Sequence, residues 1–234
     1  MAHRGNSAAA PENTRASFER AVRDGADFIE TDLHLTRDGA FVCIHDPTLL
    51  RTGGVPVTVA DVTLAELKRH PVSFGRAGFE TEFVPALEEL IALLLPGTGL
   101  ALELKTDRFL EPEVARRLGE ILRASGLLDR TAVLSFEFER CRVVKREVPE
   151  IFAGFITRLG SLPPKGEAQM VGPFWPVLFA NPFFVSRARR RGLFVAPLDE
   201  RPDGRLWYYR LLGCDAVLTN DPAATLRKLG RARL

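Results

Sequence analysis

Two charged pairs stand in short segments whose apolar residues alternate as they do in β-strands. One pair is Glu30 and Asp32, and the other is Glu103 and Lys105. Residues two apart on a strand point to the same side, so the members of each pair share a face. Three carboxylates that converge in this way would repel one another unless a cation lay among them. Ligands that are all oxygens favour a hard ion such as Ca²⁺ or Mg²⁺ over zinc.

A charged pair on a strand is more often a solvent-facing pair than a metal site. The second pair is harder to explain in that way, because leucines fill the opposite face of its strand and leave Glu103 and Lys105 to line an interior. Two of the four histidines, His3 and His45, also fall next to predicted strand ends. Together these residues predict a metal-assisted acid/base site.

The elements that position these residues alternate between strand and helix along the chain. A helix is predicted over 14–23, followed by a strand over 28–36 and, after an Asp-Gly turn, an antiparallel arm over 41–46. Further strands are predicted over 100–105, 132–136, 152–156, 177–180, 193–196 and 216–219, and helices over 85–95, 111–125, 138–148, 185–191, 204–212 and from 222 onward.

With a short first strand that ends at His3, the count is eight parallel strands, which predicts an α/β fold of the closed (β/α)8 TIM-barrel type. An open doubly wound sheet is the alternative, but its usual glycine-rich nucleotide motif is absent. Residues 47–84 lack the alternation and predict a short insertion after the second strand. Because no low-complexity linker divides the sequence, a single domain over 1–234 is expected.

Composition excludes several other classes of protein. The chain has 234 residues, 46% of them hydrophobic, so it is not a disordered chain. Its 32 basic and 30 acidic residues are too evenly matched for a nucleic-acid binder. No apolar run approaches the ~20 residues of a membrane span, so no stable membrane insertion is expected. Three widely spaced cysteines and the lack of a signal-peptide pattern predict reduced thiols and a cytoplasmic location.

Eight segments resemble the signature of the glycerophosphodiester phosphodiesterase family: 3–5 (His-Arg-Gly), 11–14 (Pro-Glu-Asn-Thr), 25–32, 36–39, 45–52, 85–89, 102–105 and 213–222. The whole set of segments, in this order and spacing, is specific to the family, whereas any one segment alone would be weak evidence for it. The resemblance implies a TIM barrel of the phospholipase-C-like phosphodiesterase type. Such a barrel hydrolyses small-molecule glycerophosphodiesters to glycerol 3-phosphate and an alcohol with one divalent cation, Ca²⁺ or Mg²⁺.

The resemblance also implies a role for eight residues: Glu30, Asp32 and Glu103 as metal ligands, His3 and His45 as the acid/base pair, Arg4 and Lys105 as phosphate-binding residues, and Glu12 as a residue that fixes the first loop or the hydrogen bonding of the site. A glycerol hydroxyl next to phosphorus is a plausible internal nucleophile, because intramolecular attack has a large effective-molarity advantage. Our hypothesis assigns the base to His3 and the acid to His45.

The sequence departs from the family pattern at two places. Only two residues precede His3, where members have a longer first strand. Either the assigned start is late, which we expect, or the first strand is very short and the barrel is weakly closed there. Pro197 stands where members have a tryptophan that helps to form an apolar wall for the glycerol. Five aromatic residues are candidates either for a substitute wall or for core packing: Phe174, Trp175, Phe183, Phe184 and Trp207.

Three alternative functions stay open at this point. The same site could act on lysophospholipids as a lysophospholipase D, or the barrel could bind phosphodiesters or a partner without catalysis. A third alternative is an aldolase that forms a Schiff base on Lys105. The sequence leaves the alcohol group, the native cation and the oligomeric state undetermined.

Overall fold

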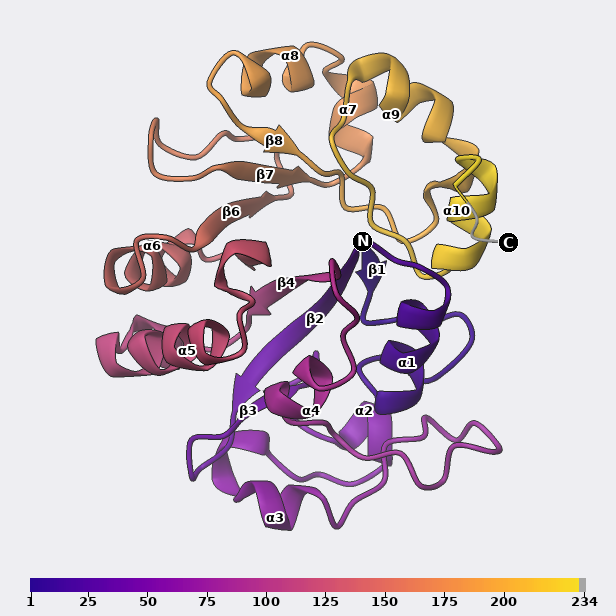
Figure 1. Ribbon diagram of the computed structural model, residues 1–234, viewed down its shortest axis with the longest axis vertical. Coiled ribbons are helices and arrows are strands. Elements are labelled where there is room, and N and C mark those ends of the chain that lie inside the picture. The colour runs from indigo at the N-terminus through magenta and orange to yellow at the C-terminus, as the bar shows by residue number, and fades with distance from the viewer. Residues whose placement is uncertain (232–234) are drawn as a thin grey trace.

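A computed structural model describes residues 1–231, which form a curled parallel sheet with helices on its outside (Figure 1). The strands are β1 (Ala2–His3), β2 (Phe28–Leu35), β3 (Phe41–Cys43), β4 (Gly99–Leu104), β5 (Thr131–Ser135), β6 (Phe152–Thr157), β7 (Met170–Pro173) and β8 (Phe194–Val195). They follow the order β1-β2-β4-β5-β6-β7-β8, and every neighbouring pair in this order is parallel. Strand β3 pairs with β2 in the antiparallel direction.

Residues 215–219 close the sheet between β8 and β1. Asp215 N donates to Val195 O at 2.8 Å, and His3 N donates to Thr219 O at 2.9 Å. The predicted strand over 216–219 is reduced to one parallel bridge between Thr219 and Ala2, because β1 offers only two residues to pair with. This closing segment completes the (β/α)8 barrel that the alternation of elements predicts.

The helices are α1 (Arg15–Arg23), α2 (Leu50–Gly53), α3 (Leu64–Leu67), α4 (Leu87–Ile91), α5 (Pro112–Ala124), α6 (Phe138–Glu147), α7 (Pro176–Ala180), α8 (Phe184–Arg189), α9 (Leu206–Leu212) and α10 (Pro222–Lys228). The Thr14 side chain accepts from Ser17 N in a capping box that starts α1. The buried face of α5, with Leu118 and Leu122, packs in the main core between sheet and helices. No helix within residues 1–231 is long and apolar enough to cross a bilayer.

The predicted strand over 177–180 is wrong, because these residues belong to helix α7 and the corresponding barrel strand is β7. A short apolar run such as Val-Leu-Phe-Ala cannot be assigned to strand or helix from periodicity alone. Pro176 decides the outcome: it occupies the first turn of α7, where its fixed φ suits a helix start and its missing N–H costs nothing. Residues 158–169, which connect β6 to β7, contain no helix.

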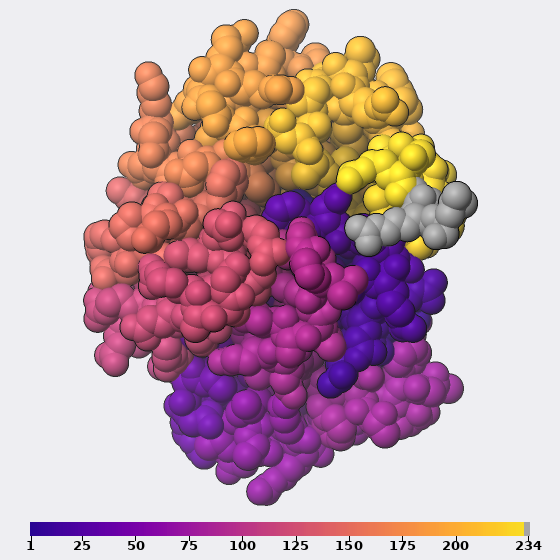
Figure 2. All heavy atoms as spheres, viewed as in Figure 1, coloured from indigo at the N-terminus to yellow at the C-terminus, as the bar shows by residue number. Residues whose placement is uncertain are grey.

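The predicted insertion after β3 has a small apolar cluster of its own. Its buried members are Val42, Ile44, Leu49, Val59, Leu67, Val72 and Val84. In the space-filling view the insertion, coloured violet to magenta, forms one end of the molecule (Figure 2). A separate apolar cluster lies across the barrel strands, formed by Ala101, Leu134, Ile156, Met170 and Ala196.

Candidate active site

Three carboxylates from adjacent strands converge at the barrel. Glu30 and Asp32 lie on β2, and Glu103 lies on β4 directly opposite Asp32 in the parallel register. One oxygen of each carboxylate lies within 4.8 Å of the others. Burial, followed by the charge of Asp32, raises the pKa of Glu30 well above its usual range, and the same two causes raise the pKa of Glu103. Such mutual repulsion is relieved when a cation binds between the groups.

Asp32 is fully buried, and its cationic neighbours keep it ionised. Burial acts to raise its pKa, but Arg4 Nε at 3.1 Å from Oδ2 and Lys105 Nζ at 3.5 Å from Oδ1 outweigh that effect and lower the pKa. Asn13 Nδ2 also donates to Oδ2 at 2.9 Å. Within residues 1–231, Asp32 Oδ1 accepts no hydrogen bond. A buried carboxylate oxygen without a donor, next to two further carboxylates, fits a hard divalent cation.

The turn after β1 directs Arg4 into this cluster. Its φ of 54° is left-handed, its N–H donates to Glu30 Oε2 at 2.9 Å, and its Nη1 donates to Glu12 Oε1 at 2.8 Å. Gly5 follows with a φ of 81°, and a Cβ there would lie 2.5 Å from Ser17 Oγ. The glycine of the His-Arg-Gly segment is therefore required by the close approach of helix α1.

His3 ends β1 with its ring held by a residue to which the sequence assigned no role. Its Nδ1 lies 2.6 Å from Asn220 Oδ1, just beyond the segment that closes the barrel. Burial, and then the charge of Arg4, lowers the pKa of His3, so the ring is neutral near pH 7. With the amide oxygen facing Nδ1, the proton is assigned to Nδ1 and the lone pair to Nε2. The signal for Asn220 was its place in the matched segment 213–222.

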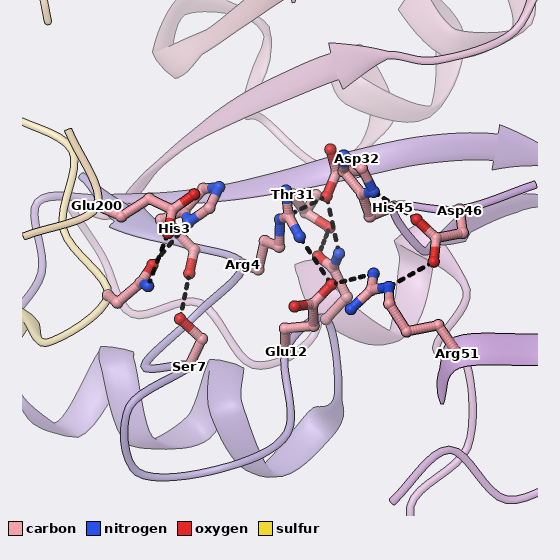
Figure 3. A network of polar contacts seen from close by, with 12 residues as sticks. His3, Arg4, Ser7, Glu12, Thr31, Asp32, His45, Asp46, Arg51 and Glu200 are labelled. Atoms are coloured by element: carbon pink, nitrogen blue, oxygen red, sulfur yellow. Dashed lines mark hydrogen bonds and ion pairs between the residues drawn. The ribbon is translucent and has the colours of Figure 1, made fainter. Parts of the chain in front are cut away.

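His45 follows the antiparallel strand β3 and begins a chain of ionic contacts (Figure 3). Its Nδ1 lies 2.6 Å from Asp46 Oδ1, and Asp46 Oδ2 accepts from Arg51 Nε at 2.5 Å. Arg51 Nη2 donates to Glu12 Oε1 at 2.8 Å, the same oxygen that accepts from Arg4. Burial acts to raise the pKa of Asp46, but its bonds to Arg51 and His45 lower that pKa to about 2. Asp46 is therefore a carboxylate at physiological pH.

A cavity of about 750 Å³ brings most of the predicted residues together. Six of them line it: His3, Arg4, Glu30, His45, Glu103 and Lys105. Asp32 is fully buried and absent from this lining, and Glu12 lines an adjoining cavity of about 190 Å³ that also contacts His3 and Arg4. Lys105 Nζ lies 2.9 Å from Glu103 Oε1, so its charge is paired inside the cavity.

The five aromatic residues that are candidates for a substitute wall or for core packing separate into three groups. Phe174 and Trp175 line the cavity directly after β7, and the Arg205 guanidinium lies 4.2 Å above the Trp175 ring. Phe184 is buried in the core of the last barrel units. Phe183 and Trp207 are exposed, and neither lines the cavity.

Comparisons with known proteins show the family to which the chain belongs. The model of the glycerophosphoryl diester phosphodiesterase family matches residues 3–224. A glycerophosphodiester phosphodiesterase of Caldanaerobacter subterraneus subsp. tengcongensis is 32% identical over 95% of this chain and 93% of its own. A probable glycerophosphodiester phosphodiesterase 1 of Mycobacterium tuberculosis is 30% identical over 96% of this chain and 90% of its own.

A solved structure has a similar fold. The chain superimposes with a TM-score of 0.87 on an Oleispira antarctica phosphodiesterase in complex with the product sn-glycerol-3-phosphate. The two are 27% identical, and the match covers 98% of this chain and 95% of the other. The chain belongs to the glycerophosphoryl diester phosphodiesterase family and is a phosphodiesterase.

Proposed function

We propose that the protein hydrolyses glycerophosphodiesters to glycerol 3-phosphate and an alcohol, with one divalent cation, Ca²⁺ or Mg²⁺, and an acid/base pair of histidines. The observation that carries this proposal is the meeting of three carboxylates, a guanidinium and two histidines at one cavity. The product held by the O. antarctica structure is of the same chemical class. Membership of a phosphodiesterase family favours this reaction over an aldolase or a barrel without catalysis.

Binding of the phosphodiester falls to the cationic groups. Glu30, Asp32 and Glu103 would hold the cation, which when bound supplies positive charge at the non-bridging phosphate oxygens. Arg4 contacts the carboxylates of Asp32 and Glu12 through Nε and Nη1. Its Nη2 has no hydrogen-bond partner among the described residues, so it is available for a phosphate oxygen. Lys105 adds a second protein charge at the same cavity.

The two histidines move the protons in this mechanism. His3 Nε2 takes the proton of the glycerol hydroxyl next to phosphorus, and the resulting alkoxide oxygen forms a new bond to phosphorus. The bond from phosphorus to the alcohol breaks, and His45 gives its proton to the departing oxygen. Water then opens the cyclic phosphate with the two roles exchanged, which yields glycerol 3-phosphate and restores both rings.

The test measures release of glycerol 3-phosphate from glycerophosphocholine by protein treated with EDTA, before and after Ca²⁺ or Mg²⁺ is added back. We expect activity to fall at least ~100-fold without the cation and to return with one of the two ions. Full activity in EDTA would contradict the role of the carboxylates, and no release with any metal would contradict the activity itself. Acylated glycerophosphocholine, assayed alongside, tests the lysophospholipase D alternative.

A further inference from the structure

Some of the cationic side chains in the cavity are paired with carboxylates, and others are not. Five lysine and arginine side chains line it. Three of them, Arg4, Lys105 and Arg205, lie 2.8, 2.9 and 2.6 Å from a carboxylate oxygen. For Arg158 and Arg201, residues 1–231 provide no carboxylate within the 4.0 Å limit of an ion pair. These two arginines are therefore the cavity-lining cations that have no carboxylate partner in the part of the chain that the structure describes.

An aromatic ring, and not a carboxylate, holds the side chain of Arg158 in position. It directly follows β6, and its guanidinium lies 4.8 Å from the centre of the Phe136 ring, which directly follows β5. Both residues line the cavity. A cation–π contact holds the guanidinium plane in place and leaves its N–H groups and its charge available for an anion.

The main chain of Arg201 is fixed, while its side chain has no ionic partner among the described residues. Arg201 N donates to Asp199 Oδ1 at 3.1 Å, and Arg201 O accepts from Arg205 Nη2 at 2.9 Å. The preceding carboxylate, Glu200, is turned toward His3 and Asn220 (Figure 3). The Asp199–Arg205 pair thus holds the main chain of residues 199–201. It pairs the charge of Arg205 with a carboxylate and leaves the charge of Arg201 without one.

The substrate identifies what these two arginines can bind. A phosphodiester has one negative charge, for which the proposed site already supplies Arg4 and Lys105. The glycerol half is uncharged and common to all substrates, so any further negative charge must come from the alcohol. We propose that this site selects glycerophosphodiesters whose alcohol bears an additional anionic group such as a phosphate, bound by Arg158 and Arg201. This inference rests on the proposed function and names its substrate class.

The test compares kcat/KM for three diesters whose alcohols are choline, glycerol and inositol 4-phosphate, which are cationic, neutral and anionic. We expect the anionic alcohol to be preferred and the cationic one to be the poorest substrate. Arg158→Gln and Arg201→Gln should each lower kcat/KM for the anionic diester about tenfold, the loss of one charge-assisted hydrogen bond, and leave the neutral diester within about twofold. Arg158→Lys keeps the charge and should lose less.

Arg187→Gln is the matched control, since it removes the same charge from an exposed position of helix α8 that does not line the cavity. Equal kcat/KM for all three diesters, or the same loss of preference in Arg187→Gln as in Arg158→Gln, would overturn the inference. The proposed function would survive that result, because glycerol 3-phosphate would still be released. No release from any of the three by the unmodified protein would instead overturn the proposed function and the inference with it.

Discussion

The rings of His3 and His45 have different partners, and this difference bears on their roles. His3 faces the neutral amide of Asn220, whereas His45 faces the carboxylate of Asp46. The lowered pKa of His3 leaves its ring neutral and fits the role of base. The contact with Asp46 orients the ring of His45, which fits the proposed role of acid.

Removal of each histidine should have a different effect on substrates with different leaving groups. For glycerophosphocholine, His3→Ala and His45→Ala should each lower kcat ~100-fold or more. For a nitrophenyl diester, whose leaving group needs no proton, His45→Ala should recover most of the rate of nitrophenol release in the first turnover, and His3→Ala should not. Single-turnover rates of alcohol release from both substrates test this assignment, because they do not depend on the later opening of the cyclic phosphate. His70→Ala of the insertion is the control. Equal losses on both substrates would count against it.

The residues of the site were easier to predict than the contacts between them. The alternation of residues along a strand predicts that Glu30 shares a face with Asp32, and Glu103 with Lys105, because residues two apart on any strand point to the same side. The partnership of His3 with Asn220 spans almost the whole chain and depends on closure of the barrel, which no local pattern encodes. The same reason explains why Arg158 and Arg201 were not singled out.

At the scale of elements, most strands and helices follow from periodicity, and the errors lie where packing decides between alternatives. The buried strands β2 and β4 and the amphipathic helix α5 are long enough to show their period. The four apolar residues of 177–180 are too few to distinguish strand from helix, and the fold places them in α7. The last predicted strand depends on β1 for its hydrogen bonds, and β1 is two residues long.

Helix α2 has only four residues, yet it joins both loops of the site through Arg51, which contacts Asp46 and Glu12. Arg51→Met should lower kcat for glycerophosphocholine about tenfold with a smaller change in KM, because His45 loses the group that orients Asp46. If Arg51 acts through His45, the variant should release nitrophenol from a nitrophenyl diester in a single turnover at close to the unmodified rate.

Arg69→Met, an exposed change in the same insertion, is the control for this experiment. A variant that loses the same factor on both substrates, or that is slow only because its melting temperature falls below the assay temperature, would show that Arg51 has a structural role alone.

At the scale of the whole molecule, a buried ionic group connects the last units of the barrel. Asp199, 3% exposed, accepts from Arg205 Nε and Nη2 at 2.6 Å and from Tyr209 Oη at 2.5 Å. Burial acts to raise the pKa of Asp199, but the bonds from Arg205 and Tyr209 outweigh it and lower the pKa. Arg205 in turn lies over Trp175, so this group also supports the cavity.

Asp199→Asn should therefore lower the free energy of unfolding by about 2–3 kcal/mol at pH 7, because Arg205 loses its buried partner. The pKa of Asp199 is lower in the folded than in the unfolded protein, so its stabilisation is present above about pH 4 and is lost as the pH falls through the folded value. Urea unfolding between pH 7 and pH 3 should show the difference from the unmodified protein narrowing in acid. Asp129→Asn, at an exposed position, is the control, and a difference independent of pH would contradict the ionic origin.

The position of His45 has a consequence for how such proteins can diverge. His3 and the three carboxylates are set by the parallel ladder of the barrel, but His45 and its partners belong to the antiparallel arm and the insertion, which has its own apolar cluster. Lengthening or exchanging that segment would move one histidine relative to the other and leave every barrel strand in register. Recombination at its two ends, near 44 and 84, would thus change the distance between the two histidines of the proposed acid/base pair, and with it the size of diester accepted, on an unaltered barrel.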